Sequence, residues 1–239
     1  MQALLDAVSG WKRPDGSPID ITPDMADKFA VYADMLEERN HVMNLTAVTG
    51  AAIAARHFAD SLKVLTVLDF GGKSVIDVGS GAGFPGLPIR IACPSVRLRL
   101  LDSTGKRVAF TREAADRLGL SDVDCVTARA EEYVKNPGQR ESYDAAVSRA
   151  VADLPMLCEL CLPYVRIGGY FAAFKGSRAK EELARSSGAI RELGGELAQV
   201  LAYRLPGSDA GMNLVLIRKI GPTPPAYPRR FAKIQAEPL

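Results

Sequence analysis

Two acidic side chains and a glycine-rich loop are the clearest chemical signal in this chain. A short β-branched run contains Asp77 and leads into a loop with Gly79, Gly81 and Gly83. Glycines let a backbone approach a ligand closely, and a helix that follows such a loop directs its positive end toward the same space. Asp102 ends the next apolar run, 23 residues after Gly79, a spacing typical of a carboxylate that binds ribose hydroxyls. The pattern predicts a site for an adenosine-containing cofactor.

The charges and donors around the loop indicate which cofactor it binds. Residues 81–86 match the dinucleotide pattern G-x-G-x-x-G, which is a weak signal alone. Asp77 at the strand end would repel a pyrophosphate but attract the ammonium group of S-adenosylmethionine. Pro85 and Pro88 lack the amide hydrogens that a phosphate-binding loop would use. We therefore expect S-adenosylmethionine rather than a nicotinamide dinucleotide, with a glycine-rich turn that binds nothing as the alternative.

The elements that must position these residues alternate along the chain. Apolar runs that fit buried strands alternate with helical patterns, which is typical of a parallel, doubly wound sheet. The expected strands are 74–78, 96–101, 123–127, 143–148 and 170–174, and the expected helices are 88–92, 106–118, 154–165 and 178–193. Strands 198–204 and 212–220 follow with no helix between them. A mostly parallel sheet that ends in an antiparallel strand pair is the Rossmann-like class I methyltransferase fold.

The same patterns predict three parts. Residues 1–70 form a helical cap, with one helix beginning at Thr22-Pro23-Asp24 and a second at about 51–68. Residues 71–220 form the methyltransferase domain that binds S-adenosylmethionine. Residues 221–239 combine a proline-rich linker with a basic tail, which we expect to stay extended rather than form a helix.

Composition narrows the class of protein. The 239 residues are 47% hydrophobic and 24% charged, which suits one compact domain with an appendage. No apolar run approaches the roughly 20 residues of a membrane span, and the first residues do not resemble a signal peptide. Cys158 and Cys161 have the spacing of a metal or redox pair, but no second pair completes a zinc site. We therefore expect reduced core cysteines, no metal and a cytoplasmic protein.

Charge is distributed unevenly along the chain. The formal net charge is +2, but residues 1–70 carry six basic and ten acidic side chains, so the rest of the chain is positive. Basic residues gather between Arg97 and Arg112 and again after Arg218. Charge runs are most often solvated faces, yet two basic clusters beside a cofactor site are compatible with a polyanionic substrate.

Three further sequence blocks accompany the glycine loop. They are Asn44-Leu45-Thr46 with Arg56-His57-x-x-Asp60-Ser61, Leu101-Asp102-Ser103-x-Gly105-Lys106-Arg107, and Val147-Ser148-Arg149-Ala150. With the loop, they resemble the bacterial ribosomal RNA small subunit methyltransferase G family, also called glucose-inhibited division protein B. The resemblance covers residues 22–220 and the tail from Tyr227. It implies methyl transfer from S-adenosylmethionine to the N7 of a specific guanine in 16S rRNA, guanine 527 in that family.

The resemblance also implies roles for individual residues. Gly79 and Phe84 match loop positions that line the methionine and ribose, and Ala130 and Glu131 match positions at the adenine end. Arg149 matches the family's arginine after the fourth strand. The complete set expected to bind cofactor is Asp77, Gly79, Gly81, Gly83, Phe84, Asp102, Ser103, Ala130, Glu131 and Arg149. The tail departs from the family pattern at Ala232, Ile234 and Ala236, where glycine, proline and lysine are usual.

The segment after the fourth strand bears on the acceptor of the methyl group. Residues 148–151 contain neither the aromatic clamp of amino-nitrogen methyltransferases nor the Pro-Cys pair of cytosine-C5 enzymes. Guanine N7 already has a lone pair and loses no proton, so it needs alignment rather than a base. Arg149 is the candidate for positioning the guanine through O6 or a phosphate, with a surface arginine as the alternative. The further substrate-binding candidates are His57, Lys106, Arg107, Arg229 and Arg230.

Several alternatives stay open at this point. His57 with Arg56 and Asp60 could instead tie the second helix to the sheet, and the tail cations could pack across the domain with Tyr227 as an anchor. A small-molecule methyltransferase on the same fold, or a non-catalytic protein that binds S-adenosylmethionine or RNA, would carry the same loop. The expected partner is 16S rRNA or the small ribosomal subunit, and the expected state is a monomer without membrane association.

Overall fold

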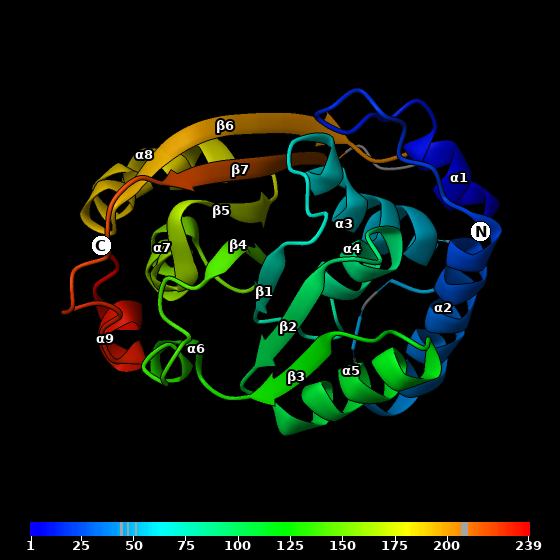
Figure 1. Cartoon of the computed structure of the whole chain (residues 1–239), viewed down its shortest axis with the longest axis horizontal. Coiled ribbons are helices and arrows are strands. Elements are labelled where there is room, and N and C mark those ends of the chain that lie inside the picture. Colours follow the sequence, from blue (N-terminus) through cyan, green and yellow to red (C-terminus); the bar gives the residue numbers. More distant parts are fainter. Residues whose placement is uncertain (44, 47, 51, 207–209) are drawn as a thin grey trace.

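A computed structural model describes residues 1–43, 45–46, 48–50, 52–206 and 210–239. Over these residues, a seven-stranded sheet with the order β3-β2-β1-β4-β5-β7-β6 runs through the molecule (Figure 1). Its strands are β1 (Ser74–Val78), β2 (Arg97–Asp102), β3 (Val123–Thr127), β4 (Tyr143–Arg149), β5 (Val165–Lys175), β6 (Gly195–Arg204) and β7 (Gly211–Lys219). Strands β1 to β5 pair in parallel, whereas β7 is antiparallel to both β5 and β6. The predicted Rossmann-like class I methyltransferase sheet is confirmed.

The first strand shows why the sheet could be recognised from apolar runs. Val75 and Ile76 are both fully buried, but they belong to different hydrophobic clusters. Successive side chains of a strand point to opposite faces, so a strand that is covered on both faces must be apolar throughout. A short run of buried apolar residues therefore marks β1, whereas β2 begins with Arg97 and Arg99 on either side of a leucine and the edge strand β3 is only partly buried.

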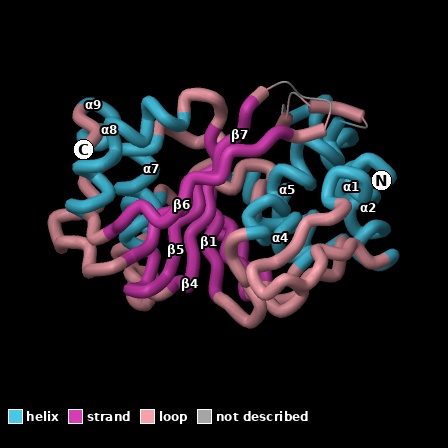
Figure 2. Tube along the Cα trace, turned by 90° about the horizontal axis from the view of Figure 1, so that it is seen from above, coloured by secondary structure: helices cyan, strands magenta, loops and turns pink. Residues whose placement is uncertain are grey.

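Helices cover both faces of the sheet (Figure 2). On one side lie α1 (Gln2–Val8), α2 (Pro23–Met43), α4 (Gly86–Ala92) and α5 (Gly105–Arg117). On the other lie α7 (Leu154–Cys161), α8 (Ala179–Glu192) and α9 (Phe231–Ala236), and the short α6 (Ala130–Tyr133) packs against the same hydrophobic cluster. The doubly wound arrangement leaves the carboxyl ends of the parallel strands free to form a site.

The N-terminal region is helical, as predicted, but its second helix is irregular. Thr22 caps α2 by accepting a 3.3 Å hydrogen bond from the Met25 amide. The segment predicted as one helix at 51–68 consists of the π-helical turn η1 (Ala54–Ala59), α3 (Asp60–Leu62) and the 3₁₀ turn η2 (Lys63–Thr66). Ala51, like Asn44 of the family motif, lies outside the described residues. A π turn is rare and often found at functional sites, and this one carries His57.

Two boundaries differ from the sequence prediction around β5. The helix predicted at 154–165 ends at Cys161 and is followed by the 3₁₀ turn η3 (Leu162–Tyr164), and β5 begins at Val165 rather than at 170. Gly168 and Gly169 are adjacent glycines, a pair that is typical of turns. The chain instead passes them within the strand, because a register shift against β4 absorbs the extra residues.

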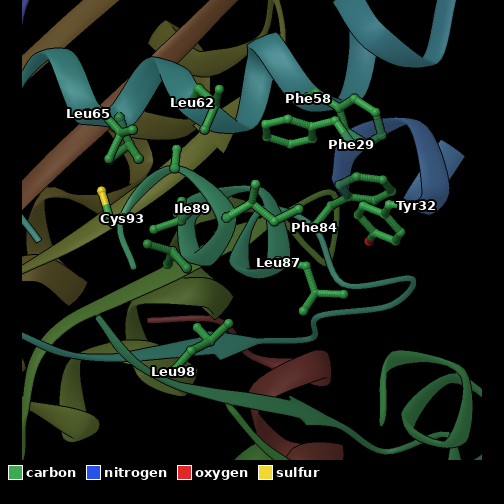
Figure 3. Packing of buried hydrophobic residues seen from close by; sticks show 14 of the residues in the cluster. Phe29, Tyr32, Phe58, Leu62, Leu65, Phe84, Leu87, Ile89, Cys93 and Leu98 are labelled. Carbon is green, nitrogen blue, oxygen red and sulfur yellow. The ribbon is translucent and has the colours of Figure 1, made fainter. Parts of the chain in front are cut away.

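The helical cap and the glycine loop share one hydrophobic core (Figure 3). Phe29 and Tyr32 of α2 pack with Phe58 of η1, and the ring centroids of Tyr32 and Phe84 lie 5.5 Å apart. The Tyr32 hydroxyl also donates a hydrogen bond to the backbone oxygen of Ala82 in the loop. Residue 70 is where the sequence changes from helical patterns to alternating strands and helices. In the structure, the helical cap packs directly against the glycine loop.

Two further features of the sequence can be placed. In the part of the chain that the structure describes, no helix is both long and apolar enough to cross a membrane. Cys158 and Cys161 are fully buried in α7, and burial raises the pKa of both thiols. They are free core cysteines, as their helical pattern predicted.

Candidate active site

The glycine loop connects the carboxyl end of β1 to α4, and Asp77 lies beneath it. The Asp77 side chain is fully buried, and its Oδ2 accepts a 2.8 Å hydrogen bond from the Gly86 amide. A Cβ on Gly86 would lie 2.8 Å from that oxygen and 2.5 Å from Leu100, so only glycine allows this approach. Burial raises the pKa of the Asp77 carboxyl to about 7. The Asp77 carboxyl group therefore stabilises the loop from its buried side, through the hydrogen bond from the Gly86 amide.

A cavity of about 440 Å³ lies above the loop at the carboxyl ends of β1 to β4. The predicted cofactor residues that line it are Gly79, Gly81, Phe84, Asp102, Ser103, Ala130, Glu131 and Arg149. Asp77 and Gly83 do not line it, because Asp77 lies behind the loop and a Cβ on Gly83 would meet Leu87 and Tyr32. In this structure the two residues shape the loop, and their contact with the cofactor stays a prediction.

Gly81 is a residue of the loop that borders the cavity. Its φ is +56°, a conformation that residues with side chains rarely adopt. An added Cβ would have only the backbone oxygen of Gly79 within 4 Å, at 4.0 Å, so it would extend into open space. A Cβ on Gly79, in contrast, would lie 2.4 Å from Val151. Gly79 therefore lets the segment after β4 close against the loop, and Gly81 borders the cavity.

Asp102 lies on the cavity wall at the end of β2. It is 5% exposed, its Oδ2 accepts a 2.9 Å hydrogen bond from the Gly81 amide, and its Oδ1 accepts one of 2.8 Å from the Thr104 amide. Arg107 Nη1 lies 3.8 Å from Oδ2 and also borders the cavity. Lys106 is exposed and lies outside the cavity lining. Two backbone amides thus hold the Asp102 carboxylate at the cavity wall, where it can accept hydrogen bonds from hydroxyl groups of a ligand.

The lining fits S-adenosylmethionine. An open glycine wall and a held carboxylate suit a ribose, and the aromatic ring of Phe84 and the apolar Leu160 suit the thioether chain and the purine. Ser80 lines the cavity, and its buried Oγ has no hydrogen-bond partner among the described residues. Buried polar groups are nearly always paired, so an ordered water or a ligand that reaches this hydroxyl would supply the missing partner.

Arg149 connects the end of β4 to the helical cap. Its Nη1 donates to Asp60 Oδ2 at 2.9 Å and to the backbone oxygen of Arg56 at 3.3 Å, and its Nη2 lies 3.1 Å from His57 Nδ1. The guanidinium also lies over the Phe84 ring, 4.7 Å from the centroid. The predicted cluster of Arg56, His57 and Asp60 therefore exists, and it ties η1 to the sheet through Arg149.

His57 is held in its neutral form. Its ring stacks on Phe84 with centroids 4.5 Å apart, and its Nε2 lies 2.6 Å from Thr46 Oγ1. Burial, followed by the charge of Arg149, lowers the pKa of His57 to about 3. A neutral imidazole can accept from Arg149 through Nδ1 and donate to Thr46 through Nε2.

A second cavity of about 590 Å³ adjoins the first at the end of β4. His57, Arg149, Ala150 and Val151 line both cavities. The second is also lined by residues from the end of β5, the start of β7 and the N-terminus of α8, including Phe174, Lys175, Met212 and Arg178. Arg149 therefore borders both cavities.

The segment that separates the two cavities is held by a buried ion pair. Lys175 Nζ lies 2.6 Å from Glu182 Oε2 and donates a 2.7 Å hydrogen bond to the backbone oxygen of Ala152. The same Glu182 oxygen accepts a 2.9 Å hydrogen bond from the Leu154 amide. Ala150 has a φ of +58°, which is unusual for a residue with a side chain. The pair holds residues 150–154 in this turned conformation.

The C-terminal segment differs from the extended tail that the sequence predicted. Residues 231–236 form α9, and Ile234 is fully buried. Arg229 donates to the fully buried carboxylate of Glu159, with Nη2–Oε2 and Nε–Oε1 distances of 2.6 and 2.9 Å. The expectation of no helix in the tail was wrong, because an apolar face that the proline-rich linker delivers to α7 can be buried there. Arg229 takes the packing role, and Arg230 is exposed outside both cavities.

Several lining residues were not identified from the sequence. They are Leu45, Thr46, Ala128, Arg129, Val151, Leu160 and Phe231. Thr46 and Val151 stand within or beside quoted family blocks, so proximity to those blocks was an available signal. Phe231 lies in the tail that resembles the family and directly follows the candidate Arg230, but nothing in the spacing of that tail indicated a place in the wall of this cavity.

The strand order, the glycine loop and the acid that ends β2 together place the molecule among known folds. A solved S-adenosylmethionine-dependent methyltransferase from Aquifex aeolicus has 17% identity and a TM-score of 0.52 and covers 66% of this chain and 89% of its own. TrmN from Thermus thermophilus has 19% identity and a TM-score of 0.51, with coverages of 70% and 53%. Fold and site define a class I methyltransferase.

The family follows from comparison of sequences. The family model described as rRNA small subunit methyltransferase G matches residues 25–206. This chain belongs to that family, as its motifs predicted, and is an enzyme of the methyltransferase class. The ribosomal RNA small subunit methyltransferase G of Pelotomaculum thermopropionicum is 44% identical over 241 residues, 100% of both chains. That of Acetivibrio thermocellus is 43% identical, covering 99% of this chain and 95% of its own.

Proposed function

We propose that this chain transfers a methyl group from S-adenosylmethionine to the N7 of a guanine in 16S rRNA. The enzyme would act as a cytoplasmic monomer on the rRNA or on the small ribosomal subunit. The names of its relatives support an rRNA substrate. The observation that carries the proposal is that two cavities meet at Arg149, so that a cofactor and a base can approach each other there.

The order of the strands suggests how the cofactor lies in the first cavity. Asp102 at the end of β2 would bind the ribose hydroxyls. The ends of β3 and α6, with Ala130 and Glu131, would then border the purine, and Gly79 and Gly81 after β1 would border the methionine. This orientation directs the reactive methyl group toward β4 and Arg149. When bound, the cofactor supplies an electrophilic methyl carbon on a sulfonium.

The second cavity would hold the target guanine. Arg149 has five N–H donors, of which three have the partners Asp60, Arg56 and His57. The remaining donors can reach an acceptor such as guanine O6 without loss of the existing contacts. Asp60 and His57 would fix the guanidinium plane, so the base would be aligned by a side chain that is already immobile.

The acid–base chemistry of the junction fits an acceptor that loses no proton. His57 is neutral, with both ring nitrogens engaged, and the carboxylate of Asp60 is paired with Arg149. Neither group is free to remove a proton. Guanine N7 needs none to be removed, because its lone pair would form the new bond to the methyl carbon while the bond from that carbon to the sulfonium sulfur breaks.

Transfer of a tritiated methyl group tests the proposal. The acceptors are 16S rRNA and small subunits from cells that lack the enzyme, and the product is identified by nucleoside mapping. We expect one modified guanine that migrates as 7-methylguanosine. Labelling of small molecules in a cell extract without RNA would identify a small-molecule methyltransferase instead. Cofactor binding without label in any acceptor would identify a non-catalytic protein.

A further inference from the structure

The C-terminal segment reaches the same cavity as the glycine loop. Phe231, the first residue of α9, lines the first cavity together with Arg129 and Ala130, which follow β3. The Arg129 guanidinium lies over the Phe231 ring, 4.7 Å from its centroid. Residues that are 101 or more positions apart along the chain therefore form one stretch of cavity wall.

Several partly buried contacts hold this segment in place. Arg140 donates to the backbone oxygens of Tyr227, Thr223 and Pro224 at 2.8, 2.7 and 3.1 Å. Arg229 is paired with Glu159, as described above. These contacts lie within and just after the proline-rich linker, and the last of them, at Arg229, is two residues before Phe231. The ring is therefore preorganised at the wall and needs no ordering when a ligand arrives.

The position of Phe231 along the wall indicates which part of a ligand it meets. Asp102 marks the ribose end of the site, and β3 lies beyond β2 on the side away from β1 and β4. A wall built after β3 therefore borders the part of an adenosine that lies past its ribose, which is the purine. An aromatic ring and an arginine are the two kinds of side chain on which purines stack.

We propose that the C-terminal segment completes the cofactor site, with Phe231 and Arg129 forming the wall against which the purine of the cofactor stacks. The inference rests on the proposed use of S-adenosylmethionine and assigns the tail to cofactor binding rather than to RNA. It explains why a terminal segment is anchored by a fully buried carboxylate. A tail that only gripped RNA would not need its aromatic residue at this cavity.

Calorimetric titration of the full chain with S-adenosylhomocysteine and with 5′-methylthioadenosine tests the inference. We expect Phe231→Ala to raise both dissociation constants by about tenfold, since both ligands carry the purine and base–aromatic stacking is of this size. Phe231→Trp should retain wild-type affinity. Lys233→Ala, an exposed change in the same helix, is the matched control and should alter neither constant.

The outcomes separate this inference from the proposed function. If the wild type binds both ligands and methylates rRNA, and Phe231→Ala is folded with unchanged dissociation constants, the tail is structural only and the inference is wrong. If Phe231→Ala weakens rRNA binding but leaves both constants unchanged, the tail is an RNA contact and the inference is again wrong. If Phe231→Ala unfolds, Phe231→Leu keeps an apolar side chain and must still weaken both ligands. If the wild type binds neither ligand, the proposed function fails as well.

Discussion

Arg149 at the end of β4 donates a 2.9 Å hydrogen bond to Asp60, which lies 89 residues earlier in the helical cap. The two side chains are 11% and 2% exposed, so the pair is almost fully removed from water. Asp60 also accepts a hydrogen bond from the Tyr203 hydroxyl of β6. Cap, central sheet and C-terminal hairpin therefore meet at one carboxylate beside the candidate active site.

The coupling between these two residues should be large. Removal of one partner of a buried pair leaves an uncompensated charge, so Asp60→Ala should lower the free energy of unfolding by about 3 kcal/mol. Urea unfolding of both single variants and of the double variant should show a coupling energy above about 1 kcal/mol. The exposed pair of Arg39 and Glu113 is the control, and its cycle should give less than about 1 kcal/mol. Equal values for the two pairs would contradict the assignment of Arg149 and Asp60 to a buried network.

Catalysis should depend on Arg149 more than folding does. Arg149→Ala should lower kcat/KM for methyl transfer to small subunits by about 100-fold, which is about 2.7 kcal/mol of transition-state stabilisation. Some loss of cofactor affinity is expected too, because Arg149 lines the first cavity. Parallel assays of turnover and cofactor binding separate the two effects. Normal turnover would make Arg149 a bystander.

Neutral His57 should make the protein sensitive to mild acid. The pKa of His57 is lowered to about 3 in the folded protein, from 6.5. Between these values the unfolded chain binds a proton that the folded protein does not, so stability falls as the pH falls from about 6.5. This contribution should amount to about 2 kcal/mol at pH 5, relative to pH 7.5.

The variant His57→Asn has no titratable imidazole at this position, and the amide oxygen of the new side chain can still accept a hydrogen bond from Arg149. Urea unfolding at pH 7.5, 6 and 5 should show that wild type loses about 2 kcal/mol more than this variant. His41→Asn is the control, because His41 is exposed on α2 and its replacement should leave the pH dependence unchanged. Parallel acid sensitivity in wild type and His57→Asn would show that His57 is protonated in the folded protein.

Cofactor affinity should depend on two residues of the first cavity. Asp102→Ala should weaken binding of S-adenosylmethionine by about 1.5–3 kcal/mol, the loss expected for a charged hydrogen-bond acceptor. Gly81→Val should abolish binding, because the branched side chain would occupy the cavity. Gly138→Val is the control, since Gly138 has a similar φ of +74° but lies outside that cavity. Unchanged calorimetric affinity in both cavity variants, with binding of NADH instead, would overturn the cofactor assignment.

The cations of the tail should separate into two groups. Arg229→Ala leaves the buried Glu159 without its partner and should cost about 3 kcal/mol of stability. Arg230→Ala with Lys233→Ala removes exposed charges only. If these two contact RNA phosphates, the double variant should flatten the salt dependence of rRNA binding by about one to two counterions. An unchanged salt slope would remove the tail from the RNA interface.

The sequence by itself determined the succession of the strands along the chain, the position of the glycine loop and the family. Each of these depends on patterns that are local along the chain. Each strand is a short segment rich in apolar residues. One β–α–β unit sets the separation of Gly79 and Asp102 along the chain, so this spacing predicts that the two residues meet at one edge of the sheet. Motifs of a few residues were likewise enough to indicate the family.

Only the tertiary structure decided which partner each charged or aromatic side chain takes. Spacing does not show that Asp77 turns to the Gly86 amide beneath the loop, that Arg149 pairs with Asp60, or that Arg229 pairs with a carboxylate buried in α7. Such choices depend on which surfaces meet when distant segments pack, and on which charges must be paired once water is excluded. Phe231 lines the first cavity for the same reason, because the anchored linker brings a terminal segment to the end of β3.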